Sequence, residues 1–276
     1  MLKQPLTIIS IVIIAAWVIL AIAAPWIAPD SPNYTGFAAL QAPSAAHWFG
    51  TDDVGRDVLS RVLWGARATL PASVILVACA SAIGTVIGVV AGYIGGWVDS
   101  TLMRITDLFF SFPAVIFAMA IVAALGPSLT NSVIAITAVS WPLFARIARS
   151  VVLNIRSADY VLVRRLLGGS TREVIAMDVM PNVIPSVVVV GALYLGEAAL
   201  LFSGLSFLGL GVRPPTAEWG AMISEGAAHF NAWWMALFPG LALMSIVVAF
   251  NLLGDVLRDL LDPTSGRVVT QTAATA

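Results

Sequence analysis

The sequence predicts an all-α, polytopic membrane protein with about six transmembrane helices. Hydrophobic residues make up 59% of the chain and charged residues only 11%, whereas an ordinary soluble domain has roughly 25% charged residues. The apolar residues form runs of about 20, the length a helix needs to cross a hydrocarbon core. The net charge is −1, which offers no basic surface for nucleic acid.

Six runs are long enough to span: Leu6–Ala28, Leu70–Tyr93, Thr101–Leu125, Ser132–Leu153, Val183–Phe202 and Met235–Leu257. The first exceeds the apolar region of a secretory signal, roughly 7–15 residues, so we interpret it as a retained helix. In the third, Arg104 and Asp107 lie one helical turn apart and can pair with each other, and Pro113 interrupts the helix.

The distribution of basic residues predicts that both chain ends are cytoplasmic, because positive residues are retained on that side. The outer segments then contain only Arg56, Arg61, Arg67 and Arg213 of the 14 basic residues. The expected parts are a first helix at 1–28, an outer segment at 29–69, a five-helix core at 70–257 with a cytoplasmic loop at 154–182, and a cytoplasmic tail at 258–276. We expect the end of the tail, Ser265–Ala276, to be disordered.

Small residues recur every fourth position in the second span, at Ala80, Gly84, Gly88 and Gly92. This spacing predicts one close-packing helix face. The face either docks on a partner subunit or packs within this chain. Cys79 lies in the same apolar run, and we expect it to serve in packing.

The outer segments carry a polar motif and several aromatic residues. The motif contains Gly50, Asp52, Gly55, Arg56 and Asp57; its spacing does not fit a calcium loop, so we expect a turn held by Asp–Arg and Asp–backbone contacts. Interfacial anchors or binding residues are expected at Trp219, Phe230, Trp233 and Trp234. We interpret His47 and His229 as surface histidines, with no metal site.

No motif for nucleotide binding, zinc hydrolysis or serine catalysis is present. We therefore predict no catalytic residue and no cofactor bound by this chain. Glu197 is the one ionisable residue near the middle of a predicted span. A carboxylate facing lipid costs at least ~2.5 kcal/mol, so Glu197 is expected to face the bundle or a substrate path. It either takes part in the path or makes a structural hydrogen bond.

The loop from Arg146 to Asn182 predicts two helical pieces, broken at Gly168-Gly169 and stopped by Pro181. The first piece has an apolar stripe beside basic residues, formed by Val161, Leu162, Arg165 and Leu166. A short amphipathic helix of this kind either docks in a groove of a soluble partner or lies on anionic lipid.

In this loop, Tyr160–Ser170 and Met180–Asn182 resemble the cytoplasmic loop of bacterial ABC importer permeases, which typically reads Glu-Ala-Ala, three residues, Gly, then Leu-Pro. Three further segments resemble the C-type permeases of the dipeptide, oligopeptide and nickel importers: His47–Asp57, Gly204–Gly211 and Asn251–Asp259. The likeness extends from about Trp48 to Pro263. The glutamate is missing, because Leu162-Val163-Arg164 stands in its place. Pro215–Gly220 resembles the nickel permeases.

This resemblance implies a type I importer permease in the bacterial inner membrane. It implies a heterodimer with a second permease, two cytoplasmic ATPases that bind ATP and Mg²⁺, and an extracytoplasmic solute-binding protein. The cargo would be di- or oligopeptides, nickel or a metal chelate. The implied contacts with the ATPase are Tyr160, Leu162, Arg164, Arg165, Gly168, Gly169 and Pro181.

The outer motif would seat the binding protein or close the outer gate. Two alternatives remain: a self-contained secondary transporter or channel with an ion site near Glu197, and a membrane scaffold that does not transport. The sequence does not name the substrate.

Overall fold

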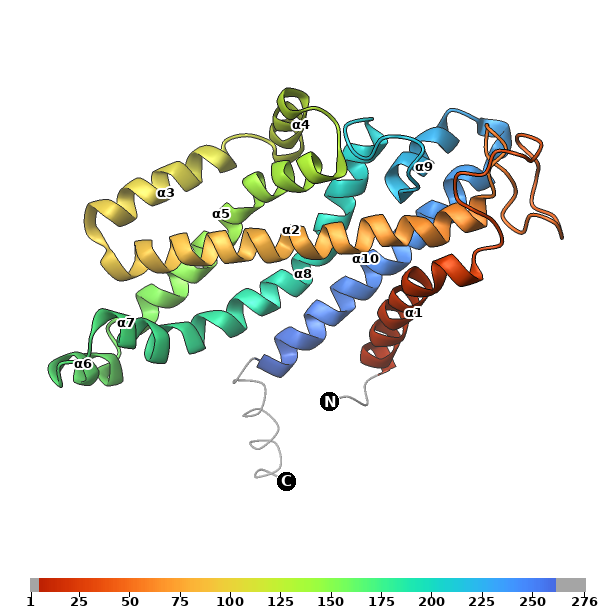
Figure 1. Ribbon diagram of the computed structural model, residues 1–276. Coiled ribbons are helices and arrows are strands. Elements are labelled where there is room, and N and C mark those ends of the chain that lie inside the picture. Colours follow the sequence, from red (N-terminus) through yellow and green to blue (C-terminus); the bar gives the residue numbers. More distant parts are fainter. Residues whose placement is uncertain (1–4, 262–276) are drawn as a thin grey trace, which may run out of the picture.

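The computed structural model describes residues 5–261, which form helices joined by loops, the longest of which is the irregular segment 28–57. Four long helices lie side by side: α2 (Val58–Ile94), α5 (Leu129–Ile155), α8 (Met180–Phe207) and α10 (Trp234–Leu261). Helix α1 (Pro5–Ile27) packs on α2 and α10 (Figure 1). The expected disorder of Ser265–Ala276 and the charges of Lys3 and Arg267 lie outside the described residues.

Five helices of the described part are long and apolar enough to cross a membrane, or six if a bent pair forms one span. The runs predicted for α1, α5 and α10 are confirmed within a few residues. The third run is a pair instead, α3 (Gly96–Phe110) and α4 (Ala114–Leu125), which meet at 89°. Pro113 causes the break, because it lacks an N–H and disfavours helical geometry in the residue before it.

The bent pair returns the chain between two helices that run in the same direction. Helices α2 and α5 both run from the side of α9 (Trp219–Ala227) toward the side of α6 (Asp159–Leu166) (Figure 1). The chain must cross back between them, and α3 with α4 makes that return. The bundle therefore has an α6 end and an α9 end, and α1 begins and α10 ends away from the α9 end.

The predicted pair between Arg104 and Asp107 is wrong. Asp107 accepts a hydrogen bond of 2.6 Å from Arg146 on α5, and Asp99 accepts two from Arg149, at 2.5 and 2.6 Å. The acidic residues of α3 thus reach across to α5, where arginines lie within reach. These pairs attach α3 to α5.

Helix α2 begins at Val58, well before the predicted start at Leu70. Asp57 caps it by accepting the backbone N–H of Ser60 at 2.8 Å, which satisfies one of the free donors of the first turn. Hydropathy missed these turns because polar side chains such as Arg61 and Thr69 are buried in them. Residues 58–69 of the predicted outer segment are therefore helical.

The small-residue face of α2 packs within this chain, against α5. A Cβ atom added at Gly84 would lie 2.4 Å from the backbone oxygen of Trp141, and one at Gly88 would lie 2.3 Å from that of Ala145. Only glycine permits this approach of two backbones. The internal alternative is confirmed, so this face is not free for a partner.

Gly88→Ala is therefore expected to destabilise the protein by about 1–3 kcal/mol, the usual cost of overpacking. Thermal unfolding in detergent measures this. Gly240→Ala is the matched control, because nothing lies within 4 Å of a Cβ atom there; helix propensity predicts a neutral or stabilising effect of up to about 1 kcal/mol. Equal melting temperatures for the two variants would contradict the packing argument.

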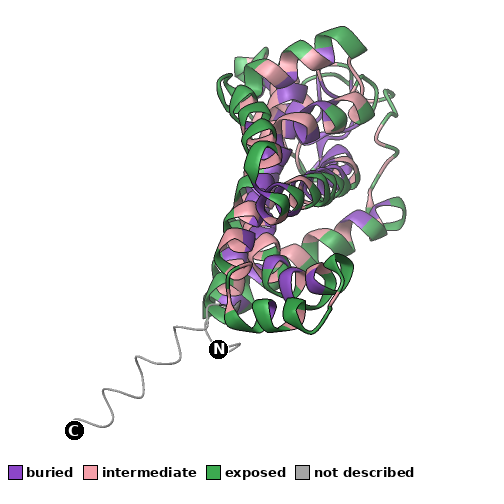
Figure 2. Cartoon of the chain, turned by 90° about the vertical axis from the view of Figure 1, so that its left-hand side faces the viewer, coloured by how far each residue is buried: buried purple, intermediate pink, exposed green. Residues whose placement is uncertain are grey.

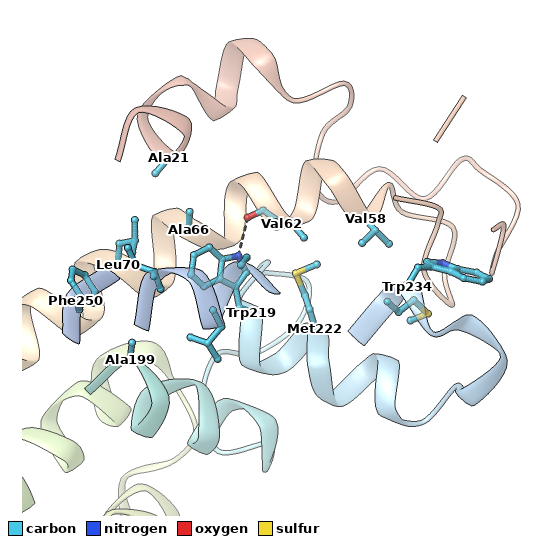
Figure 3. Close-up of a cluster of buried hydrophobic side chains, with 14 of the residues drawn as sticks. Ala21, Val58, Val62, Ala66, Leu70, Ala199, Trp219, Met222, Trp234 and Phe250 are labelled. Carbon is cyan, nitrogen blue, oxygen red and sulfur yellow. Dashed lines mark hydrogen bonds between the residues drawn. The ribbon is translucent and has the colours of Figure 1, made fainter. Parts of the chain in front are cut away.

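Two of the four aromatic residues expected at the membrane interface are instead in the core at the α9 end. Trp219 is fully buried, and its Nε1 donates to the backbone oxygen of Val62 at 2.9 Å (Figure 3). Trp234 is also buried and donates to the oxygen of Thr51 at 3.0 Å. Phe230 and Trp233 are exposed, as an interfacial role requires. The burial of the two tryptophans could not be predicted from the sequence, because their hydrogen-bond partners lie on distant segments of the chain.

Exposed residues cover the outward faces of the bundle, whereas buried ones lie between the helices (Figure 2). Cys79 is exposed, so the expectation that it packs within the chain is wrong.

Candidate functional site

The segment 154–182, here called the basic loop, contains the glycine turn that the sequence predicted. Helix α6 ends at Leu166, and Gly168 follows with a φ of +87°. The N–H of Gly168 donates to the oxygen of Arg165, and that of Gly169 donates to the oxygen of Arg164, both at 3.0 Å. Left-handed geometry at this position favours glycine, and nothing lies within 4 Å of a Cβ atom there.

Helix α6 has one side chain in the core and several apolar ones in the open. Val161 is fully buried in a cluster with Val152 of α5 and Val183 of α8. The exposed apolar side chains are Leu162, Val163, Leu166 and Leu167, of which Leu166 is 86% accessible. Tyr160 is half exposed. Helix α6 is thus fixed to the bundle on one side and presents an apolar surface on the other.

The prediction that Pro181 stops the second helical piece is wrong. Helix α7 (Thr171–Val174) begins with a capping box between Ser170 and Glu173 and continues through a π-helical turn, Ile175–Val179, into α8. Pro181 lies in the first turn of α8. Proline is tolerated at such a position, and the wider π turn accommodates the change in hydrogen bonding.

Arginines of the basic loop attach it to the spans. The Nε of Arg164 lies 2.5 Å from Oδ2 of Asp178, and the guanidinium of Arg165 lies over the ring of Tyr93, 4.8 Å from its centre. Arg156 donates to the backbone oxygen of Gly92 at 3.0 Å. A movement of α6 would therefore be transmitted to α2 through Tyr93 and to the start of α8 through Asp178.

At the α9 end, the outer motif forms the turn that was predicted. Asp52 accepts the backbone N–H groups of Val54 at 3.1 Å and Arg56 at 2.8 Å, and its Oδ2 lies 2.5 Å from Nε of Arg56. Gly50 and Gly55 both have positive φ. The predicted Asp–Arg and Asp–backbone contacts are confirmed.

Sequence reasoning missed the partners that this turn finds elsewhere. Arg61 is only 1% exposed; it donates to the backbone oxygens of Pro32 and Pro215 and lies 3.4 Å from Glu225 of α9. Arg56 lies 3.1 Å from the same carboxylate. We call Asp52, Arg56, Arg61 and Glu225 the charged cluster. Burial raises the pKa of Glu225, and the two arginines oppose that shift.

His47 is buried, so its interpretation as a surface histidine is wrong. Its Nδ1 lies 3.1 Å from Oδ1 of Asp57, whereas His229 is partly exposed and contacts the backbone oxygen of Glu225. Together with Asp30, His47 and Asp57 could offer three ligand atoms to a metal. Both oxygens of Asp57 are already engaged, by His47 and by Ser60. We assign no metal to this group.

A second set of three acids, Asp52, Asp53 and Glu225, also lies within metal-ligand distance. The guanidinium groups of Arg56 and Arg61 already supply positive charge there, so a cation would be opposed. Sequence reasoning also missed Glu218, which is fully buried at the start of α9. Its carboxylate accepts the N–H groups of Gly220 and Ala221, both at 2.9 Å, and burial raises its pKa.

Glu197 does not point into the bundle of this chain. It is exposed on α8, one turn from Tyr194, which hydrogen-bonds Ser140 of α5 at 2.8 Å. The expectation of an inward carboxylate is wrong, and the substrate-path alternative stays a prediction.

Comparison with known proteins identifies what this bundle is. Residues 84–267 match the family described as "Binding-protein-dependent transport system inner membrane component". The chain belongs to this family. It is a polytopic inner-membrane permease of the peptide group of ABC importers, as the motifs predicted.

The permease is similar to curated relatives over nearly its whole length. It is 44% identical to the probable D,D-dipeptide transport system permease protein DdpC of Escherichia coli (strain K12), over 96% of this chain and 90% of the relative. It is 41% identical to the dipeptide transport system permease protein DppC of Alkalihalophilus pseudofirmus, over 95% and 86%. It is 43% identical to the glutathione transport system permease protein GsiD of Shigella dysenteriae serotype 1, over 95% and 87%. None of these three names refers to nickel.

Proposed function

We propose that this permease moves short peptides into the cytoplasm as one of two permease subunits that share a path. ATP and Mg²⁺ are bound by two separate ATPases, and an extracytoplasmic binding protein delivers the peptide. The observation that carries this proposal is the α6 helix, which is packed on the bundle on one side and exposes leucines on the other. A subunit without a nucleotide-binding motif must be driven by a separate ATPase, and it needs a surface that binds this ATPase. The relatives named for dipeptides and glutathione favour peptide over nickel.

The α6 end faces the cytoplasm in this proposal. The arginines of the basic loop and of the last turns of α5 gather there, among them Arg149, Arg156, Arg165 and Arg172, and positive residues are retained inside. Both chain ends are then cytoplasmic, since six crossings return the chain to the side on which it began.

Coupling runs from the ATPase through α6 to the spans. Leu162 and Leu166 insert into an apolar groove of the ATPase, and Tyr160 lies at the rim. Because Val161 is packed against α5 and α8 and Arg164 is paired with Asp178, a shift of α6 moves the start of α8. The missing glutamate is consistent with a contact that is mainly apolar.

This contact predicts a binding defect. The double variant Leu166→Ser with Leu167→Ser should lose the ATPases on co-purification, because it removes two leucines that no part of residues 5–261 covers. The control is Leu237→Ser with Leu241→Ser, two exposed leucines on α10. Stoichiometric recovery of the ATPases with the α6 variant would overturn the assignment.

The charged cluster stabilises the α9 end of the bundle. It ties the 29–57 segment, the start of α2 and α9 into one unit, and we assign this unit to seating the binding protein and supporting the outer gate.

Glu197 is placed on the path, because an exposed carboxylate in the middle of a span would be costly against lipid. Glu197→Gln is expected to lower peptide uptake while expression stays normal. Leu200→Met, also exposed on α8, is the control and should transport normally. Unchanged uptake by Glu197→Gln would remove Glu197 from the path.

A further inference from the structure

An apolar groove runs along the surface between α2 and α5. Its volume is about 660 Å³, and it is lined by Ile75, Cys79 and Ile83 from α2 and by Val133 and Ile134 from α5. Four of these five side chains are exposed. No other element of the described chain covers this groove, which is as large as many ligand sites.

Arg67 lies at the mouth of the groove, toward the α9 end. Its guanidinium is 4.8 Å from the ring centre of Trp64, and it has no ion pair among the described residues. Arg56 and Arg61, at the same end, are both buried and paired with carboxylates. Arg67 is therefore an available positive charge beside an apolar hollow.

The depth of Arg67 matches the headgroup layer of a bilayer. Gly92, whose backbone oxygen accepts from Arg156, lies near the α6 end of α2, which the orientation proposed above places at the cytoplasm. At 1.5 Å per residue, Arg67 lies about 37 Å further along the helix. A bilayer with its headgroups is roughly 40–45 Å thick, so Arg67 reaches the opposite headgroups while the groove lies in the hydrocarbon.

A second, more polar hollow of about 380 Å³ adjoins the first and shares Arg67 with it. Asn33 and Thr216 line it. Their side chains and that of Arg67 offer an amide, a hydroxyl and a guanidinium, all donors suited to a phosphate. The two hollows together form a site with a polar end and an apolar end, which matches the shape and polarity of an amphiphile.

We propose that this groove holds one acyl chain of an anionic phospholipid of the outer leaflet, with its phosphate at Arg67. A peptide is a poor occupant, because the groove wall offers hardly any partners for peptide N–H and C=O groups. The charge of Arg67 selects an anionic headgroup, and Trp64 is suited to the interface. The lipid joins α2 to α5 at the membrane-facing surface. This inference does not depend on the identity of the transported substrate.

Cys79 provides the test, because it is the only cysteine of the chain and lies within the groove. The purified full complex is stripped of lipid in detergent and treated with N-ethylmaleimide, and modification of this chain is followed by mass. Titrated phosphatidylglycerol should slow the reaction. Phosphatidylcholine with the same chains should do so less, and glycerol phosphate not at all.

Arg67→Gln should raise the half-protecting concentration of phosphatidylglycerol by about tenfold, the loss expected for one charge-assisted contact. Arg213→Gln, an exposed arginine that does not line the groove, should leave it unchanged. Equal protection by both phospholipids with no effect of Arg67→Gln would overturn the headgroup assignment. Protection by glycerol phosphate alone would overturn the acyl-chain assignment. A Cys79 that is unreactive in the stripped complex would show that the second permease covers the groove, and would overturn the proposal.

Discussion

Arg61→Ala is expected to destabilise the permease by about 3–5 kcal/mol, the cost of breaking a buried ion pair. The side chain is almost wholly buried, and its removal leaves the carboxylates of Asp52 and Glu225 with less positive charge. It also frees the backbone oxygens of Pro32 and Pro215. The measurements are the melting temperature in detergent and the yield of folded protein in membranes.

Arg213→Ala is the matched control, because Arg213 is an exposed arginine of the same end and the loss of such a charge usually changes stability by less than about 0.5 kcal/mol. If the Arg61 and Arg213 variants melted at the same temperature, the charged cluster would not hold the α9 end together.

Gly168→Val is expected to abolish peptide uptake while membrane insertion stays normal. A β-branched residue at a φ of +87° is strained, so the turn after α6 would change direction and move the exposed leucines away from the ATPase. Because a Cβ atom meets no other segment there, the effect comes from the local backbone conformation and not from a clash with another part of the protein. Uptake of labelled dipeptide by cells, normalised to the amount of permease in membranes, measures it.

Gly168→Asn separates conformation from side-chain size. Asparagine adopts positive φ more readily than valine does, so this variant should keep a large part of the uptake. Normal transport by Gly168→Val would show that the turn has no role in coupling.

Hydropathy predicted most of the spans because a membrane imposes one length and one composition on them. It placed α1, α5 and α10 well, and Pro113 predicted an interruption of the third run, but not that α3 and α4 would meet at 89°. The bend was encoded locally by Pro113, whose effect on direction cannot be read from apolarity. The early start of α2 was missed since its first turns bury Arg61, which a hydropathy average counts as an outer residue.

The parts of the candidate site that were predicted depend on residues close in sequence. The Asp52–Arg56 turn and the Gly168 turn each close within a few residues, so their patterns were visible. The hydrogen bond between Arg61 and Glu225 joins residues that are 164 positions apart. A contact of this kind cannot be predicted from a single sequence. The exposure of Glu197 likewise depends on how α8 is rotated among its neighbours.

The triplet that replaces the missing glutamate of the loop makes a polar contact within this chain. Arg164 stands at the end of the Leu162-Val163-Arg164 triplet and pairs with Asp178, so the polar contact there lies within the chain. Val163 and Leu166 are exposed. The exposed surface of α6 therefore combines apolar side chains with that of Arg165.

The most direct test of the account is transport in proteoliposomes. The permease is reconstituted with its second permease and both ATPases, with the binding protein outside, and dipeptide accumulation is followed with and without ATP. We predict accumulation that requires ATP and every subunit, and that is lost when the ATPases are omitted. Dipeptide accumulation by the permease alone, driven by an ion gradient, would contradict the account.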